Sequence, residues 1–421
     1  MLTIFIPENI PWVNKGEVAI LKGMLKTFQI LENDINILIS SSWPKQDQKG
    51  YGKILNVVPK GTLTSNKLLN FLKHIRYPVG VFLKNYPKII RIIFPKGDYL
   101  RWKCLESCDI VLIGHDNCVI EISFEAFCII LAAKMLNKIV IFYSGSFGPY
   151  KGLFRKILAR ESFNRADLIT CREPISYEHL VKLGLKTKPR LTADLAFLLD
   201  LVDIELKKIL PSRIDFTKPL FGLNATRIMS KYSFKKLKGK KAKYKKYIGV
   251  LSKITEYIIE KYQANILLIP HVYGYHPEND DRRVLKDIYD FLKNTRRVFL
   301  LEKEFLPEEL KGIISKLDVF IGARTHSIIA AISSGVPTLA FTSADKQYNK
   351  TNGILNYMLG SRDLLYNVED MSFTSLKEKI DWIYANKEIL KKKLNKRAKV
   401  MEKMALLNGF LLKSILNNKN R

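Results

Sequence analysis

Short runs of apolar residues alternate, in the first half of the chain, with longer segments in which apolar residues recur every three or four positions. The run at 2–7 (LTIFIP) predicts a strand, and the segment 17–31 that follows has the period of a helix. Strands that are apolar throughout are typical of a sheet buried on both faces. The same reasoning predicts strands at 35–40, 109–114, 138–143, 167–171 and 190–195, and helices at 120–136, 151–163 and 175–183. We therefore expect a parallel sheet with crossover helices.

A segment without clear periodicity, residues 200–219, contains Pro211 and Pro219 and interrupts this pattern, which then restarts. Strands are expected at 220–225, 265–270, 298–301, 318–322 and 338–341, and helices at 245–261, 281–292, 307–316 and 326–334. The pattern predicts an α/β fold of two Rossmann-like domains facing a cleft. Their expected bounds are 1–205 and 206–385, with a helical tail at 386–421. Ligands bind beyond the carboxyl ends of such strands, so the cleft is the candidate site.

Charge changes this picture, because 70 Lys and Arg against 40 Asp and Glu give a formal net charge of +30. Such an excess attracts anions, or it reflects only a lysine-rich composition. The tail 387–421 carries eleven Lys and Arg against two acids, with apolar residues interleaved. This basic amphipathic pattern predicts a helix that binds an anionic membrane surface, that packs on the N-terminal domain, or that does both.

Several classes of protein are excluded by composition. The first residues lack the basic start of a signal peptide, and no apolar run is long enough to span a bilayer. Five cysteines occur without a C-x-x-C pair, so we expect free thiols and no metal site. We expect a cytoplasmic protein, with peripheral attachment to the inner face of a membrane left open.

The most informative polar cluster follows the strand predicted at 318–322. Arg324, Thr325 and His326 fall at the turn into the next helix, and Gly335 ends that helix. A helix start favours an anion, and Arg324 and His326 add positive charge. The alternative is an ordinary strand-to-helix junction with a capping Thr and an incidental His.

Arg172 repeats this geometry after the strand predicted at 167–171, where Pro174 and Ser176 open a helix. A guanidinium binds a carboxylate or phosphate through two parallel hydrogen bonds. The alternative is a surface arginine paired with Glu173.

Two glycine-containing turns also follow predicted strands. The segment 14–20 (NKGEVAI) leads into the first helix but is not G-x-G-x-x-G, so dinucleotide binding is poorly supported. The segment 143–150 (YSGSFGPY) would allow a ligand to approach its backbone closely. Ordinary tight turns explain both equally well.

Taken in order, these segments resemble the polysaccharide pyruvyl transferase family. The resemblance spans residue 2 to about residue 350. The most specific element is G-x-R-x-H-x-x-I-x-A-x-x-x-G-x-P, and Glu17 is a departure from a usual Asp. The matching residues are Asn14, Gly16, Ala19 and Ile20; Ser146, Gly148 and Pro149; Arg172, Glu173 and Ser176; Ala193 and Asp194; Gly322, Arg324, His326, Ile329, Ala331, Gly335 and Pro337; and Lys346.

The resemblance implies a glycosyltransferase-B type fold and transfer of a pyruvyl group from phosphoenolpyruvate to a sugar of a polysaccharide or lipid-linked glycan, without a cofactor. His326 would transfer protons, and Arg172 and Lys346 would stabilise the departing phosphate. The C-terminal domain would hold the donor phosphate, and the N-terminal domain would face the acceptor. The remaining substrate-binding residues would be Arg324, Thr325, Asn14, Gly16, Glu17, Ser146, Gly148 and Asp194.

Two other functions compete. A nucleotide-sugar glycosyltransferase would share the fold, and Glu302 and Glu304 are the nearest candidates to hold a donor ribose. Nucleic-acid binding is suggested by nine lysines at 231–247, together with aromatic residues that could stack on bases. No recognised nucleic-acid module is present, so we expect that partner to be absent.

Overall fold

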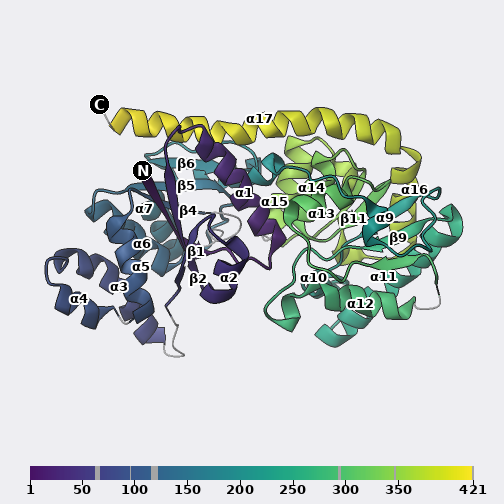
Figure 1. The fold of residues 1–421 in the computed structure, drawn as a ribbon, viewed down its shortest axis with the longest axis horizontal. Helices are drawn as coiled ribbons and strands as arrows, with labels where there is room; N and C mark the ends of the chain where they lie inside the picture. The colour runs from purple at the N-terminus through teal and green to yellow at the C-terminus, as the bar shows by residue number, and fades with distance from the viewer. Residues whose placement is uncertain (62–66, 95, 115–121, 293–294, 346–347, 420–421) are drawn as a thin grey trace. The chain divides into compact units, whose positions relative to one another are not determined.

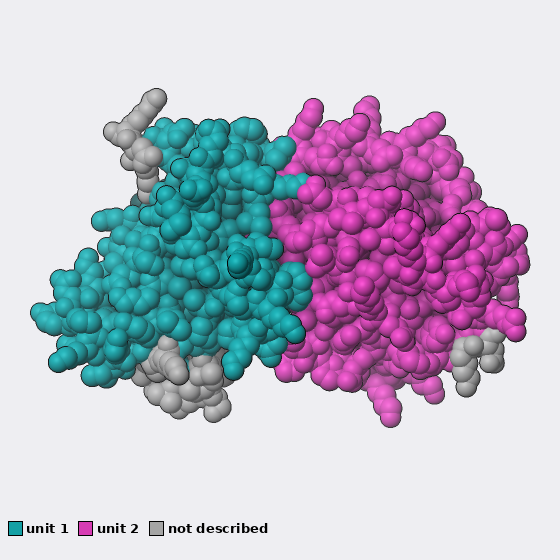
Figure 2. All heavy atoms as spheres, in the orientation of Figure 1, with its two compact units in different colours: residues 1–12, 24–194, 404–421 teal, residues 13–23, 195–403 magenta. Residues whose placement is uncertain are grey.

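The computed structural model describes residues 1–61, 67–94, 96–114, 122–292, 295–345 and 348–419 (Figure 1). The chain forms two compact units, coloured separately in Figure 2. Unit 1 comprises Met1–Trp12, Met24–Asp194 and Met404–Arg421, and unit 2 comprises Val13–Gly23 and Leu195–Lys403. The start of the first helix thus belongs to the second unit. Among the described residues, no helix is both long and apolar enough to cross a membrane.

Unit 1 is built on a seven-stranded parallel sheet in the order β3-β2-β1-β4-β5-β6-β7. Ile4 of β1 lies opposite Ile37 of β2 on one side and Ile110 of β4 on the other. All three are apolar because helices cover both faces of the sheet. The strands are β1 (Leu2–Asn9), β2 (Ile35–Ser41), β3 (Asn56–Pro59), β4 (Ile110–Ile113), β5 (Ile139–Gly145), β6 (Leu168–Cys171) and β7 (Arg190–Leu191).

The apolar pattern did not predict the short helix α2, nor three consecutive helices around this sheet, α3, α4 and α5. These three consecutive helices enclose a cluster of rings in which Phe94 stacks on Trp102 at 5.0 Å and meets Tyr77 edge-on at 5.4 Å. The helices of this part of the chain are α1 (Lys15–Gln29), α2 (Pro44–Tyr51), α3 (Lys67–Phe82), α4 (Pro87–Ile93), α5 (Lys96–Ser107), α6 (Phe124–Met135), α7 (Leu153–Phe163) and α8 (Pro174–Val181).

Unit 2 contains a six-stranded parallel sheet in the order β10-β9-β8-β11-β12-β13. Its strands are β8 (Leu220–Leu223), β9 (Asn265–Leu268), β10 (Val298–Leu300), β11 (Val319–Gly322), β12 (Thr338–Thr342) and β13 (Leu365–Asn367). Its helices are α9 (Leu206–Ile209), α10 (Arg227–Tyr232), α11 (Lys240–Tyr262), α12 (Asp281–Phe291), α13 (Pro307–Ile314), α14 (Thr325–Ser333), α15 (Asn349–Asn352) and α16 (Phe373–Ala385).

The predicted fold class is confirmed: both units are α/β with parallel sheets. Each strand predicted from the sequence has a counterpart in the structure. The two strands that were missed, β3 and β13, are short and lie at sheet edges, where few positions need to be apolar. The expected domain boundary lay at 205–206, and the compact units change at Asp194 and Leu195.

The basic tail forms one helix, α17 (Lys387–Lys419), whose first part belongs to unit 2 and whose part from Met404 belongs to unit 1. One face is buried: Leu394 and Leu412 are inaccessible, and Asn408 accepts from Thr192 Oγ1 at 3.1 Å. Gly409 lies against the end of α1, where an added Cβ would come within 2.5 Å of the Thr27 carbonyl oxygen. The expectation that the tail packs on the N-terminal part of the fold is therefore met by this face.

The lysine-rich segment 231–247 runs from the end of α10 into the first turns of α11. Its aromatic side chains pack within unit 2 or bond to it: Tyr247 is inaccessible, Phe234 is 6% exposed, and Tyr244 donates to Asp287. Tyr232 meets Tyr348 edge-on at 5.5 Å. These rings therefore have structural partners within unit 2.

Candidate functional site

The candidate site of unit 2 lies where the strand order reverses. β8 and β11 are neighbours, but the chain leaves β8 toward β9 on one side and returns to β11 on the other. Crossovers therefore leave this position in opposite directions, which opens a crevice at the carboxyl ends of the two strands. Asn224 follows β8 and Arg324 follows β11, and the Arg324 backbone N–H donates to Asn224 Oδ1 at 3.0 Å.

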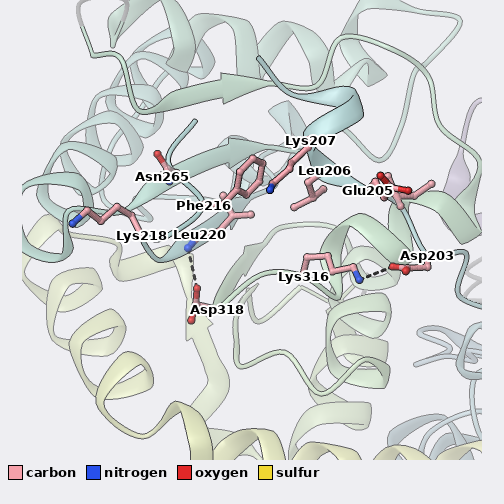
Figure 3. A pocket seen from close by; sticks show the side chains of 11 residues that line it. Asp203, Glu205, Leu206, Lys207, Phe216, Lys218, Leu220, Asn265, Lys316 and Asp318 are labelled. Atoms are coloured by element: carbon pink, nitrogen blue, oxygen red, sulfur yellow. Dashed lines mark hydrogen bonds and ion pairs between the residues drawn. The ribbon is translucent and has the colours of Figure 1, made fainter. Parts of the chain in front are cut away.

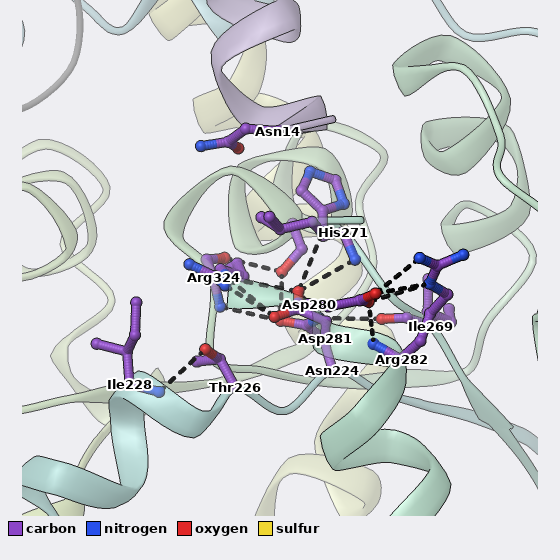
Figure 4. Close-up of polar contacts among 12 residues, drawn as sticks. Asn14, Asn224, Thr226, Ile228, Ile269, His271, Asp280, Asp281, Arg282 and Arg324 are labelled. Carbon is purple, nitrogen blue, oxygen red and sulfur yellow. Dashed lines mark hydrogen bonds and ion pairs between the residues drawn. The ribbon is translucent and has the colours of Figure 1, made fainter. Parts of the chain in front are cut away.

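A buried carboxylate holds the Arg324 side chain in place (Figure 4). Asp281, at the start of α12, accepts from Arg324 Nη2 at 2.8 Å and from Nε at 3.2 Å. It also accepts from the backbone N–H groups of His271 and Val272 at 3.2 and 3.1 Å. The Asp281 side chain is 1% exposed and that of Arg324 is 20% exposed. One buried carboxylate thus fixes both the arginine and the chain segment after β9.

His326 and Thr325 occupy the first turn of α14, as the sequence predicts. The Thr325 hydroxyl is 2.7 Å from that of Thr351, and His326 is 7% exposed. Because α14 begins here, its N-terminal amide groups and dipole favour negative charge beside His326. The position is suited to an anionic ligand.

The start of α1 lies against the same histidine. Asn14 and Val272 form an antiparallel bridge, Lys15 N–H donates to the His271 carbonyl at 3.1 Å, and Tyr273 N–H donates to the Val13 carbonyl at 2.9 Å. These bonds hold the first turn of α1 within unit 2. A Cβ added at Gly16 would stand 2.6 Å from His326 Nδ1. Glycine is therefore required here for packing.

Charged side chains on this turn are paired. Lys15 is inaccessible, and its ammonium lies 2.6 Å from a Glu304 carboxylate oxygen. Burial lowers the pKa of Lys15, and Glu304 opposes that shift. Asn14 Nδ2 donates to Glu17 Oε1 at 2.7 Å. Glu304, a candidate ribose ligand of the competing function, is thus engaged by Lys15.

Four residues of this cluster were not singled out in the sequence: Lys15, Asn224, His271 and Asp281. Figure 4 shows His271 between the start of α1 and the Arg324–Asp281 pair. Burial, together with the nearby His326, Arg324 and Lys15, lowers the pKa of His271 to about 3, so its imidazole is neutral. Among the described residues its ring nitrogens have no hydrogen-bond partner. The available signal was its position directly after a strand.

Arg172 belongs to unit 1, where it is fully buried rather than on the surface. Its Nη1 lies 2.7 Å from Asp194 Oδ2, and both side chains are 0% exposed. Its Nε donates to Ser146 Oγ at 2.9 Å. Three predicted residues from separate motifs are therefore joined here. Glu173, the predicted alternative partner of Arg172, instead caps α8 by accepting from Ser176 N–H at 3.0 Å.

Gly148 lies in the turn after β5 with φ of +68°, a conformation that favours glycine. An added Cβ would also stand 3.0 Å from the His179 Cβ. The alternative of an ordinary tight turn therefore has a conformational basis at Gly148, and its role in ligand binding stays a prediction. Lys346 lies outside the described residues. Within the described part of the chain, no group of His, Cys, Asp and Glu could hold a metal ion.

The polysaccharide pyruvyl transferase family model matches residues 14–345, most of the chain. The chain belongs to this family. The amylovoran biosynthesis protein AmsJ of Erwinia amylovora is 23% identical over 443 residues, covering 99% of this chain and 100% of that protein. This member of the pyruvyl transferase family is therefore a glycan-modifying transferase.

Solved structures resemble this family member in fold. A UDP-GlcNAc 2-epimerase from Neisseria meningitidis superposes with a TM-score of 0.59 at 13% identity, covering 99% of this chain and 100% of that one. A glycosyltransferase from Rickettsia africae gives 0.56 at 14% identity, covering 99% of both chains. The fold is of the glycosyltransferase-B type, as expected.

A separate depression of about 400 Å³ in unit 2 is shown in Figure 3. It is lined by Leu220, Asn265 and Asp318, which stand at the amino ends of β8, β9 and β11. Ligands of parallel α/β sheets bind at the opposite edge, where His326 and Arg324 lie. This depression therefore lies at the edge of the sheet where ligands of such folds do not bind.

Proposed function

We propose that this pyruvyl transferase family member transfers the pyruvyl group of phosphoenolpyruvate to a sugar of a polysaccharide or lipid-linked glycan. The observation that carries the proposal is the convergence of two helix starts on His326, at the switch point of the unit 2 sheet. α14 begins at Thr325, and α1 is held there by the bridge between Asn14 and Val272. Two helix starts, with Arg324 beside them, favour a small ligand of high negative charge.

Phosphoenolpyruvate has such a charge distribution, because a phosphate and a carboxylate are attached to the same carbon. Arg324 retains 20% exposure while Asp281 fixes its orientation, so it can meet an anion without losing its own partner. An ordered arginine loses less side-chain entropy on binding than a flexible one. The site is therefore organised in advance for an anion.

The reaction requires no oxidant or reductant. The methylene carbon of the donor takes a proton and becomes a methyl group, and the central carbon forms bonds to two sugar oxygens. The bond from that carbon to the phosphate oxygen breaks, and inorganic phosphate leaves. Of the two hydroxyl protons, one balances the new methyl group and the other leaves with phosphate. His326 is the proposed carrier of these protons, because imidazole accepts and donates near neutral pH.

The test is incubation with phosphoenolpyruvate and a panel of lipid-linked sugars, followed by measurement of phosphate release and of product mass. We expect stoichiometric phosphate and a product that has gained one pyruvate ketal. UDP-sugars in place of phosphoenolpyruvate should give no product. Transfer from a UDP-sugar, with none from phosphoenolpyruvate, would instead establish the nucleotide-sugar glycosyltransferase and refute the proposal.

We further propose that α17 attaches the enzyme to an anionic membrane surface, where a lipid-linked acceptor is presented. Its outer face carries Lys396, Lys399 and Lys403, all exposed, at spacings of three and four residues. Large apolar residues lie among them along the helix: Ile389, Val400, Leu407 and Phe410 are 69%, 40%, 40% and 57% exposed. Lysines near an anionic surface contribute about 1 kcal/mol each.

Deleting α17 would remove buried residues such as Leu394 and uncover the surface they pack on, so charge reversal is the sharper test. Lys396, Lys399 and Lys403 would be replaced by Glu, and flotation with phosphatidylserine liposomes would be measured. A control with the same change in net charge replaces the exposed Lys182, Lys186 and Lys188. We expect the α17 variant to lose at least about tenfold in bound fraction and the control to lose little. Equal flotation of both variants would refute attachment through α17.

A further inference from the structure

Unit 1 contains a cavity that none of the predicted site residues lines. Its volume is about 220 Å³, and its walls include Pro7, Glu8 and Asn9 from the end of β1 and Ile113 from the end of β4. β1 and β4 are neighbours in the sheet order, with β2 and β3 on one side and β5, β6 and β7 on the other. The cavity therefore lies at the switch point of unit 1, where parallel α/β sheets bind ligands.

A buried ion pair shapes one side of this cavity. Arg101, which is 2% exposed, donates through Nη1 to Glu125 Oε1 at 2.7 Å, through Nη2 to the Pro7 carbonyl at 3.0 Å and through Nε to Ser40 Oγ at 3.1 Å. All three nitrogens of the guanidinium thus donate to groups of unit 1. Arg101 positions the wall of the cavity and is not offered to a ligand.

Glu125 presents a fixed carboxylate to the cavity. Its side chain is 18% exposed, and Lys60 Nζ lies 4.0 Å from its Oε2. Burial alone would raise the pKa of Glu125, but Arg101 and Lys60 lower it overall, so the carboxylate is ionised. A second carboxylate, that of Glu8, accepts from Gly114 N–H at 2.9 Å. Two carboxylates face two cations, so the cavity does not select for a charged ligand.

The rest of the lining combines the polar residues Asn9 and Ser123 with an apolar wall. In this wall Ile113 is inaccessible and Ile129 is 2% exposed, and Ala126 is its smallest side chain. Carboxylates and an ammonium suit hydroxyl groups, and aliphatic walls suit the C–H faces of a ring. This combination, in a space smaller than a typical drug-sized pocket, fits one neutral monosaccharide unit.

We propose that the cavity bounded by Glu8, Lys60, Arg101, Glu125 and Ile129 binds one neutral sugar residue, the acceptor unit if the proposed function is correct. The Glu125 carboxylate accepts hydrogen bonds from the hydroxyls, and Lys60 donates to them. Sugar binding by the cavity is independent of the proposed function, and only the role of that sugar as the acceptor rests on it. Its test therefore uses sugars alone, without phosphoenolpyruvate.

Binding of a panel of neutral methyl hexosides to the full chain would be measured by saturation-transfer NMR. A single ring in a preformed cavity is expected to bind at roughly millimolar concentration. Two variants act on the cavity by different means: Ala126→Leu fills it without changing charge, and Glu125→Gln removes the ionised acceptor. The matched control is Glu161→Gln, because Glu161 also pairs with an arginine but lies on the surface, at α7. Circular dichroism would establish that each variant folds.

We expect at least one hexoside to bind, with affinity reduced at least about tenfold in both cavity variants and unchanged in the control. Binding by none of the panel, or equal binding by a folded Ala126→Leu variant, would overturn the inference. Displacement of the hexoside by inorganic phosphate at equal concentration would overturn the claim that the cavity binds a neutral ligand. A chain that binds hexosides here but not phosphoenolpyruvate would keep the inference and refute the proposed function.

Discussion

Asp281 is predicted to control both the stability of unit 2 and the readiness of its anion site. In Asp281→Asn the side chain keeps its shape but loses its charge and one acceptor oxygen. The structure shows it accepting from Arg324 and from the backbone N–H groups of His271 and Val272. The new amide N–H₂ is itself a donor, and it would face the N–H groups that the Asp281 carboxylate now accepts from. Arg324 would be left with an uncompensated charge.

Removing one partner of a fully buried ion pair costs about 3–5 kcal/mol. Because the Arg324 side chain is 20% exposed, solvent compensates part of this loss, and we expect about 2–4 kcal/mol. For a domain of this size that corresponds to a fall in Tm of roughly 5–15 °C. Affinity for phosphoenolpyruvate should also fall, since the guanidinium is no longer held.

A matched pair one residue away supplies the control. Asp280 accepts from Arg282 Nη2 at 2.7 Å, with Arg282 42% exposed, and it caps α12 by accepting from the Arg282 N–H. Asn caps a helix as well as Asp does, so Asp280→Asn loses only a surface ion pair, about 0–1 kcal/mol. Thermal unfolding followed by circular dichroism compares the two. Equal Tm values would show that burial of Asp281 has no special role, and would refute the reasoning.

The remaining predictions concern packing, protonation and charge. Gly16→Ala should reduce turnover by about 10²-fold, because the new Cβ would push the His326 imidazole out of position. The control Gly249→Ala should leave turnover unchanged, because an added Cβ there has nothing within 4 Å. The folded state keeps His271 neutral down to about pH 3, whereas the unfolded chain protonates this imidazole below about pH 6.5. The free energy of unfolding should therefore fall as the pH is lowered, by about 1.4 kcal/mol at pH 5.5. His271→Leu should flatten this dependence in unfolding measured across that range. Lys346→Ala should weaken phosphoenolpyruvate binding, measured by calorimetry, by about 1.5–3 kcal/mol, and unchanged affinity in the folded variant would remove Lys346 from the site.

The sheet cores and the α14 junction could be predicted because both are local signals. A run such as VFIG, followed by Arg324 and then by a helical period, contains the strand, the turn and the helix start within a few residues. Parallel strands buried on both faces must be apolar throughout, so they stand out from their surroundings. The helices α3, α4 and α5 do not stand out in the sequence, because Pro78 and Pro87 interrupt their apolar pattern. Aromatic stacking takes the place of regular periodicity there.

The partners of the site residues could not be predicted, because they are far apart in the chain. Arg324 pairs with a carboxylate 43 positions earlier. The first turn of α1 joins unit 2 through a bridge from Asn14 to Val272. Arg172 and Asp194 were each singled out, but their ion pair and complete burial appear only in three dimensions. Sequence patterns indicate which residues follow strands, whereas the fold decides which of them meet.

The central claim is that His326 transfers protons to or from a phosphoenolpyruvate-derived donor. The most direct measurement combines a titration of donor binding with a turnover assay at saturating donor, for the wild type and His326→Gln. Gln keeps a hydrogen-bonding side chain but cannot act as an acid, so donor affinity should be largely retained while turnover falls by about 10²–10⁴. His276→Gln, on an exposed loop of the same unit, serves as control and should match the wild type. Turnover of His326→Gln near the wild-type rate would contradict the account.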